Sequence, residues 1–219
     1  GVAAALTARR RAVVPVHYAG VACDMGAIGE IARKHRLLVI EDAAQGLMAR
    51  YKGRALGSFG QLATLSFHET KNIVSGEGGA LLINDLEFVE RAEIIREKGT
   101  DRSRFFRGQI DKYTWVDVGS SYLPSDLLAA FLYAQFEARE SIQARRQRIW
   151  NYYHHSLQEW AGAQDVRLPI VPAECDHPSH LYYILLPTLE RRQRLIESLK
   201  AQAITSVFHY LPLHLSKMG

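Results

Sequence analysis

A strand, a helix and a second strand follow one another near the start of the chain, and this order limits the fold more than any other feature. Residues 12–17 form a short apolar run interrupted by Pro15, which predicts a buried strand. Residues 25–35 place apolar side chains on one face of a helix that Asp24 can cap, and residues 37–40 form a second apolar run. Because strands joined by a helix run parallel in one sheet, the sequence predicts an α/β fold.

Further elements follow in alternation. Residues 62–67 and 78–83 predict two more strands, and residues 86–98 predict a helix. Residues 99–121 carry many charges and glycines without a clear period, so they predict a long functional loop. The basic side chains of this loop could contact a diphosphate or be ordinary surface charge. A long helix is expected over residues 125–160.

The last part of the chain has a different order of elements. Apolar runs at 181–186 and 206–210 predict strands, and residues 189–202 between them predict a helix. This β-α-β order indicates part of a second, smaller α+β domain.

Composition and charge argue against several classes of protein. The net charge of +4 is too small and dispersed to indicate a nucleic-acid partner, and no apolar run reaches the ~20 residues of a membrane-spanning helix. Cys23 and Cys175 are far apart in sequence and indicate neither a disulfide framework nor a zinc site. We therefore expect a cytoplasmic protein without a metal ion, and its positive charge is compatible with an anionic small substrate.

Polar residues that could carry chemistry follow two of the predicted strands. Asp42 follows the strand over 37–40 and could meet a cationic ring nitrogen at the carboxyl edge of the sheet, or serve only as a turn or cap residue. Ser66 ends the strand over 62–67 and could bind a phosphate. Lys71 could reach the same crevice, although most lysines in loops are surface residues. The residues alone leave both interpretations open.

Four segments in a fixed order make the pattern more specific. They are Val-Ile-Glu-Asp-Ala-Ala-Gln at 39–45, Gly-Ser-Phe-Gly at 57–60, Ser-Phe-His-Glu-Thr-Lys-Asn at 66–72 and Gly-Glu-Gly-Gly-Ala at 76–80. Together they resemble the DegT-type family of sugar aminotransferases. That family has the fold-type I architecture of enzymes that use pyridoxal 5'-phosphate (PLP), so the resemblance implies this fold and this cofactor.

Carried over residue by residue, the resemblance implies that five residues bind PLP. Lys71 would carry the cofactor through a Schiff base and move the proton during transfer. Asp42 would pair with the pyridine nitrogen and Gln45 would face the ring. Ser66 would bind the phosphate, and Ser121 would replace an asparagine that many relatives supply from the partner subunit.

The resemblance also implies domains, partners and an activity. Residues 1–135 would be the C-terminal part of the PLP-binding large domain. Residues 136–219 would be a connecting helix and part of the small domain, where Tyr210 and His214 lie near the substrate pocket. We expect a homodimer that transfers an amino group from L-glutamate to a nucleotide-linked keto-sugar. Because relatives have a long segment before the position of Gly1 and further residues after the end of this chain, we expect a fragment that is inactive by itself.

A closer likeness within the family is carried by residues 17–23, 67–72, 93–100 and 105–115. It implies dTDP-4-keto-6-deoxyglucose as the amino acceptor. Three alternatives stay open: another sugar or amination at C3, a non-catalytic homologue, and a sugar 3-dehydratase. Lys71 argues against the last, because that branch has histidine at this position.

Overall fold

The computed structural model describes residues 2–7 and 9–218, which belong to two compact units. Unit 1 comprises Gly1–Tyr152 and Ile170–Tyr182, and unit 2 comprises Tyr153–Pro169 and Tyr183–Gly219. The chain therefore leaves unit 1 within a long helix, returns to it for a short segment and leaves again. The domain boundary predicted at residue 135 stays a prediction.

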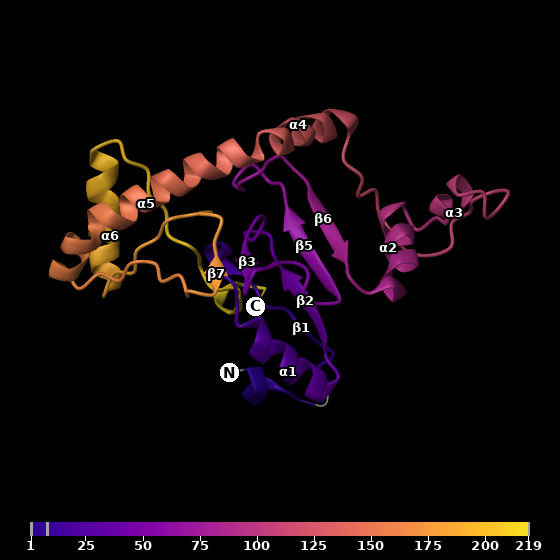
Figure 1. The fold of residues 1–219 in the computed structure, drawn as a ribbon, viewed down its shortest axis with the longest axis horizontal. Helices are drawn as coiled ribbons and strands as arrows, with labels where there is room; N and C mark the ends of the chain where they lie inside the picture. The colour runs from indigo at the N-terminus through magenta and orange to yellow at the C-terminus, as the bar shows by residue number, and fades with distance from the viewer. Residues whose placement is uncertain (1, 8, 219) are drawn as a thin grey trace. The chain divides into compact units, whose positions relative to one another are not determined.

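The centre of unit 1 is a four-stranded sheet with the order β1-β2-β5-β6 (Figure 1). Strands β1 (Ala12–Val13), β2 (Leu38–Asp42) and β5 (Leu62–Ser66) are parallel. Strand β6 (Gly79–Ile83) pairs antiparallel with β5. The predicted α/β fold with a mainly parallel sheet is confirmed. Strand β1 is shorter than predicted, because Pro15 has no N–H to donate to a ladder.

The crossover between β1 and β2 contains helix α1 (Met25–His35), which has the predicted bounds. Asp24 caps it as predicted, since its Oδ1 accepts a hydrogen bond from Ala27 N at 3.0 Å. Arg36 ends the helix in the left-handed conformation with a φ of 52°. Before α1, a short 3-10 turn, η2, covers Tyr18–Gly20.

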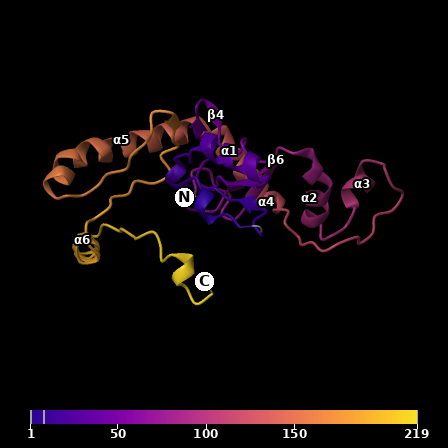
Figure 2. The ribbon, with the colours of Figure 1, turned by 90° about the horizontal axis from the view of Figure 1, so that it is seen from below.

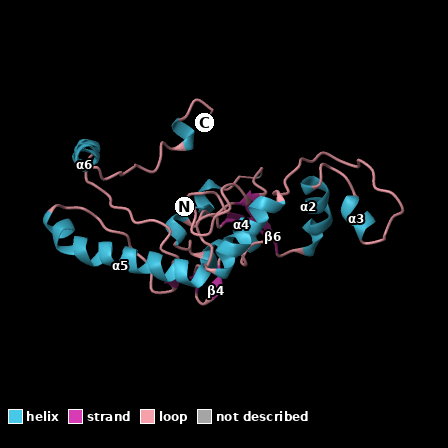
Figure 3. Ribbon diagram, turned by 90° about the horizontal axis from the view of Figure 1, so that it is seen from above, coloured by secondary structure: helices cyan, strands magenta, loops and turns pink. Residues whose placement is uncertain are grey.

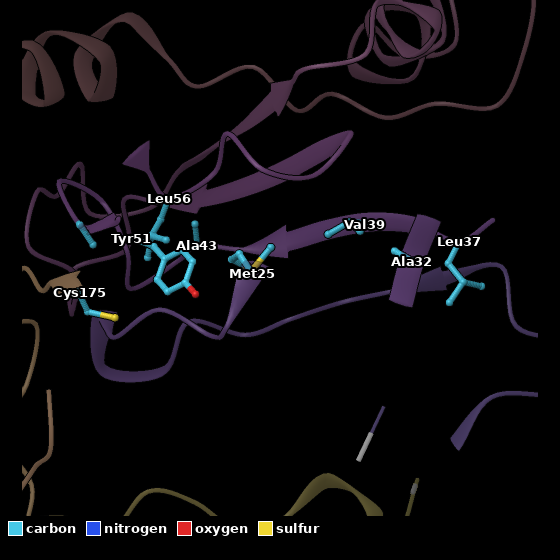
Figure 4. Packing of buried hydrophobic residues seen from close by; sticks show 9 residues of the cluster. Met25, Ala32, Leu37, Val39, Ala43, Tyr51, Leu56 and Cys175 are labelled. Carbon is cyan, nitrogen blue, oxygen red and sulfur yellow. The ribbon is translucent and has the colours of Figure 1, made fainter. Parts of the chain in front are cut away.

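Buried side chains from α1, β2 and the loop that follows form the hydrophobic core of unit 1 (Figure 4). Tyr51 is part of this core, and its hydroxyl donates to Asp24 Oδ1 over 2.9 Å. The core residues are Met25, Ala32, Leu37, Val39, Ala43, Ala49, Tyr51, Leu56 and Cys175. Cys175 enters because β7 (Cys175–Asp176) pairs with β3 (Arg50–Tyr51), which also pairs with β4 (Arg54–Ala55).

Helices α2 (Val89–Arg96) and α3 (Arg102–Phe106) lie next to each other beyond the β6 edge of the sheet (Figure 2). The helix predicted over 86–98 is present as a 3-10 turn, η3 (Leu86–Phe88), followed by α2. The predicted loop contains α3, which the sequence period did not indicate. Both terminal nitrogens of Arg107 donate to the Glu93 carboxylate at 2.8 Å, so this basic side chain joins the end of α3 to α2.

Two helices, α4 (Asp126–Glu137) and α5 (Arg139–Ala163), replace the single long helix predicted from Ser125. Ser125 Oγ accepts from Leu128 N at 3.4 Å, which is the predicted cap. Figure 3 shows α4 and α5 as two successive helices. Phe136 near the end of α4 packs edge-on against Phe67, which directly follows β5, with ring centroids 5.8 Å apart.

Unit 2 contains the end of α5, helix α6 (Leu189–Ala201) and a 3-10 turn, η4 (Leu213–Leu215). Helix α6 agrees with the prediction, and Thr188 caps it. The strands predicted over 181–186 and 206–210 are wrong, because neither segment is regular β structure. A strand requires a neighbouring backbone to pair with, and within the described residues only one isolated bridge, Arg167 to Leu185, forms there.

Candidate active site

The parallel strands β2 and β5 end side by side, and the polar residues predicted to carry chemistry lie at this edge. Asp42 is the last residue of β2 and pairs with Thr64, two residues before Ser66 ends β5. The chain then turns, and Lys71 N donates to His68 O at 2.9 Å. Carboxyl ends of parallel strands are where α/β sheets bind ligands, so the edge has the expected position for a site.

A small hollow at this edge brings together Gln45, Ser66 and Lys71. The three residues lie within 26 positions of one another in the sequence. Gln45 follows β2, Ser66 ends β5, and Lys71 lies in the turn after β5. The hollow is also lined by Ala44, Leu47, Asn72, Ile73 and His180. A glutamine, a serine and a lysine thus lie around one small space in unit 1.

Gln45 and Ser66 are both held by backbone amides. Gln45 Oε1 accepts from Ala19 N at 2.6 Å, which leaves the Nε2 amino group as the end that can donate to a ligand. Ser66 Oγ accepts from His68 N at 3.3 Å. Because this bond uses an oxygen lone pair, the hydroxyl proton of Ser66 can still be donated to an anion.

Asp42 makes the contact expected of a turn residue. Its Oδ1 accepts from Ala44 N at 3.1 Å. Within the part of the chain that the structure describes, Oδ2 makes no hydrogen bond, and the side chain is half-buried without lining the hollow. The turn interpretation therefore explains Oδ1 of Asp42. The proposed contact between Oδ2 and a ring nitrogen stays a prediction.

The remaining predicted residues do not line the hollow. Ser121 is exposed and forms an isolated bridge with Glu97 after α2. Tyr210 and His214 belong to unit 2, where both are exposed. Their predicted roles stay predictions.

Asn72 and His180 also line the hollow, and neither was singled out as a candidate from the sequence. Asn72 is 8% exposed and His180 is 9% exposed, and Asn72 Oδ1 lies 2.8 Å from His180 Nδ1. Asn72 directly follows Lys71, which could have drawn attention to it. A lone histidine 108 residues further along carried no signal.

A buried carboxylate, that of Glu41, links β2 to neighbouring segments through hydrogen bonds. Glu41, which directly precedes Asp42, accepts hydrogen bonds from the amides of Gly57, Phe59 and Gly60 at 2.6–2.8 Å. A fourth comes from His17 Nε2 at 3.0 Å. Burial alone would raise the pKa of Glu41, but the hydrogen bonds from His17 and these amides outweigh it and hold the pKa below its ordinary value.

The tautomer of His17 follows from its second ring nitrogen. Nδ1 accepts from Cys23 N at 3.2 Å, so Nε2 carries the proton that is donated to Glu41. Gly60 allows the loop to approach closely, since a Cβ there would lie 2.3 Å from Val39 O. The Gly-Ser-Phe-Gly segment thus wraps the Glu41 carboxylate and fixes the strand on which Asp42 stands.

Within residues 2–7 and 9–218, no group of three or more His, Cys, Asp or Glu side chains is arranged to hold a metal ion. In the same ranges, no helix is both long enough and apolar enough to cross a bilayer.

Comparison with known proteins gives a family and a fold. The family model described as the DegT/DnrJ/EryC1/StrS aminotransferase family matches residues 1–218. GDP-perosamine synthase of Caulobacter vibrioides is 36% identical over 216 residues, which cover 97% of this chain and 55% of that protein. The dTDP-3-amino-3,4,6-trideoxy-alpha-D-glucose transaminase of Streptomyces venezuelae is 34% identical over 214 residues, which cover 97% and 52%.

A solved structure agrees with the sequence relatives. DesV of S. venezuelae, in complex with a ketimine intermediate, superposes with a TM-score of 0.85 and 34% identity over 99% of this chain and 55% of that one. The fold is therefore the fold-type I architecture predicted from the sequence. This chain spans about half the length of the curated relatives it matches.

Proposed function

The chain belongs to the DegT/DnrJ/EryC1/StrS aminotransferase family, and on this basis we propose that it carries the cofactor-binding lysine, Lys71, of a PLP-dependent nucleotide-sugar aminotransferase. The observation that carries the proposal is the convergence of Gln45, Ser66 and Lys71 on one hollow at the carboxyl ends of β2 and β5.

The residues at this edge fit the chemical groups of PLP. The cofactor has an aldehyde, a pyridine nitrogen, a phosphate and a flat ring. Lys71 offers a primary amine to the aldehyde, and Ser66 offers a hydroxyl proton to the phosphate. Asp42 keeps one carboxylate oxygen for a protonated ring nitrogen. Gln45 offers amide hydrogens beside the ring.

The protein's own residues then have distinct tasks. Bound PLP supplies an electrophilic carbon and a ring that accepts electrons from the reacting bond. Asp42 keeps a proton on the ring nitrogen, because a nearby carboxylate favours the charged form of that nitrogen. Lys71 Nζ would take the proton from the donor carbon in the first half of the reaction, and in the second half would move a proton between the cofactor and the sugar carbon, as an amine that is alternately base and acid. Ser66 and Gln45 orient the cofactor.

The finer proposal names the substrates. L-Glutamate would donate the amino group and leave as 2-oxoglutarate, and dTDP-4-keto-6-deoxy-D-glucose would accept it at C4. The product would be dTDP-4-amino-4,6-dideoxy-D-galactose, a building block of surface polysaccharide such as enterobacterial common antigen. The support is the likeness in the loop over residues 100–115. Relatives are named for GDP-linked and for dTDP-linked sugars, so family membership supports only the nucleotide-sugar class.

We also propose a homodimer in the cytoplasm. Exposed apolar side chains gather between residues 115 and 133 of unit 1, where a monomer would leave them in water. They are Trp115, Val116, Val118, Tyr122, Leu123, Leu127, Phe131 and Tyr133. Ser121 lies in the same stretch, which supports a contribution of this residue to the partner's phosphate site. The free thiols of Cys23 and Cys175 fit a reducing compartment.

The experiment that tests the proposal traps the cofactor on its lysine. The PLP-loaded full-length protein is reduced with borohydride, digested and mapped by mass spectrometry, and we expect the pyridoxyl group on Lys71. Lys34 on α1 is an exposed control lysine in the same digest. A stoichiometric label on any lysine other than Lys71 contradicts the proposal, and an unlabelled protein favours a non-catalytic homologue.

A further inference from the structure

Asn72 is buried directly beside Lys71 and joins the lysine's turn to a distant segment. Its Nδ2 donates to Pro178 O at 2.6 Å and more weakly to Gln143 Oε1 at 3.4 Å. Its Oδ1 lies 2.8 Å from Nδ1 of His180. Because a carbonyl oxygen can only accept, the contact with Pro178 O fixes which way the amide points. Nδ1 of His180 must therefore carry the proton that Asn72 Oδ1 accepts.

The segment that receives these bonds is itself held in place by α5. Arg146 Nη2 donates to His180 O at 2.6 Å, and Ser179 Oγ donates to Gln147 Oε1 at 3.0 Å. Ser179 has a φ of 50°, a left-handed conformation that is unfavourable for a residue with a side chain. Such a conformation persists only where its surroundings enforce it. Residues 178–180 therefore form a fixed platform for the Asn72 amide.

We propose that Asn72 is a positioning residue for Lys71, acting by clamping the turn after β5 onto this platform. Lys71 has a flexible four-carbon stem and is half-buried at the hollow. Asn72 and Ile73, which follow it, are buried. A turn anchored on one side of Lys71 directs the amine toward the hollow, where His180 forms part of the wall. The proposal rests on the proposed function in that Lys71 is taken as the cofactor lysine.

The test substitution is Asn72→Asp. It keeps the size of the side chain and the oxygen that faces His180, but it sets a carboxylate oxygen against Pro178 O in place of the amide donor. The matched control is Asn84→Asp. Asn84 Nδ2 donates to Gly57 O at 2.9 Å and Gly60 O at 2.8 Å, so the same change removes the same kind of bond away from the hollow.

Two measurements separate positioning from general stability. In cofactor-free protein, competitive acetylation with acetic anhydride is followed at Lys71 against Lys34, and we expect faster modification of Lys71 in Asn72→Asp only. With PLP added to the full-length protein, borohydride trapping at timed intervals gives the rate of covalent loading. A misplacement of about 1 Å costs on the order of 100-fold in rate, so we expect loading to slow by at least ~10-fold in Asn72→Asp and to be unchanged in Asn84→Asp.

The outcomes are distinguishable from failure of the proposed function. If Asn72→Asp and Asn84→Asp change Lys71 equally, or neither does, Asn72 is not a positioning residue. If PLP loads another lysine in the unsubstituted protein, the proposed function fails, while the acetylation of cofactor-free protein still decides the role of Asn72. Should Asn72→Asp not fold, His180→Phe and His180→Gln replace it. Glutamine restores a donor to Asn72 Oδ1 and phenylalanine does not, so equal Lys71 acetylation in these two variants also overturns the proposal.

Discussion

Nε2 of His17 donates a hydrogen bond to Glu41 Oε2 over 3.0 Å, and neither side chain is exposed to solvent. Three amides of the 57–60 loop bond to the same carboxylate. Glu41 lies one residue before Asp42, so this network fixes the end of β2 from inside the unit. The Asp42 carboxylate, which is proposed to act on the cofactor, therefore depends on a neighbour whose side chain points to the opposite face of the sheet.

Replacing Glu41 by glutamine should destabilise the protein strongly. A glutamine has one acceptor oxygen, and its amino group would face N–H donors in the same buried space. An unsatisfied buried donor costs ~1–3 kcal/mol, so we expect the free energy of unfolding to fall by at least ~2 kcal/mol. Urea unfolding monitored by circular dichroism measures it. Glu30→Gln, on the exposed face of α1, is the matched control and should change stability by less than ~0.5 kcal/mol.

The Glu41 network also predicts how stability depends on pH. The pKa of Glu41 is held below its ordinary value of 4.5 in the folded state. A depressed carboxylate pKa contributes stability that is fully present above the ordinary value and is lost as pH falls through the folded-state pKa. The difference in unfolding free energy between the unsubstituted protein and Glu41→Gln should therefore be constant from neutral pH down to about 4.5 and should shrink as the pH falls further, through the folded-state pKa. A difference that stays constant below pH 4.5 as well would show that the Glu41 charge does not contribute.

The elements predicted correctly from the sequence are those whose ends are marked by nearby residues, such as a capping side chain. Helix α1 begins at Asp24, whose side chain caps it, and the β-α-β order requires parallel pairing. The strands predicted near Leu185 and Val207 failed for a different reason. An apolar run shows only that its side chains suit a β-strand. Whether a strand forms depends on whether another segment of backbone lies next to it for pairing.

The residues of the candidate site also fall into those that could be predicted from the sequence and those that could not. Gln45, Ser66 and Lys71 lie close to strand ends, so topology alone brings them to one edge. His180 reaches the same hollow through a segment that returns to unit 1 late in the chain, and no periodicity or spacing could indicate that return. Its partner Asn72 was visible in the motif, but its role depends on the buried carbonyl of Pro178.

Asp42→Asn should leave the fold intact and nearly abolish transamination. Asparagine keeps the oxygen that accepts from Ala44 N, so the turn after β2 is preserved. It loses the charge that holds a proton on the ring nitrogen. We expect turnover to fall at least ~100-fold, as for other single electrostatic contacts to a transition state. Steady-state kinetics of the full-length protein with glutamate measure it, and turnover close to that of the unsubstituted protein would leave Asp42 as a turn residue only.

A charge in the apolar stretch over residues 115–133 should disrupt the proposed dimer. Leu127 on α4 is 84% exposed, so Leu127→Glu costs little in a monomer but buries a charge in an interface. Sedimentation velocity should show a shift from dimer to monomer. Ile170→Glu, at a residue 79% exposed outside this stretch, is the control. Equal sedimentation of both variants and the unsubstituted protein would place the interface elsewhere.

The nucleotide of the substrate can be decided by comparing 4-keto-6-deoxy sugars linked to dTDP, UDP and GDP. UDP lacks the thymine methyl group and adds a ribose 2'-hydroxyl, whereas GDP carries a larger purine. One methyl or methylene group in a matching apolar pocket is worth ~10–200-fold in kcat/KM. We therefore expect the dTDP sugar to be preferred over the UDP sugar by at least ~10-fold, and the GDP sugar to be disfavoured by its size. The position of the new amino group, read by NMR of the product, should be C4. A preference for UDP or GDP, or amination at C3, would assign the protein to a different branch of the family without altering the role of Lys71.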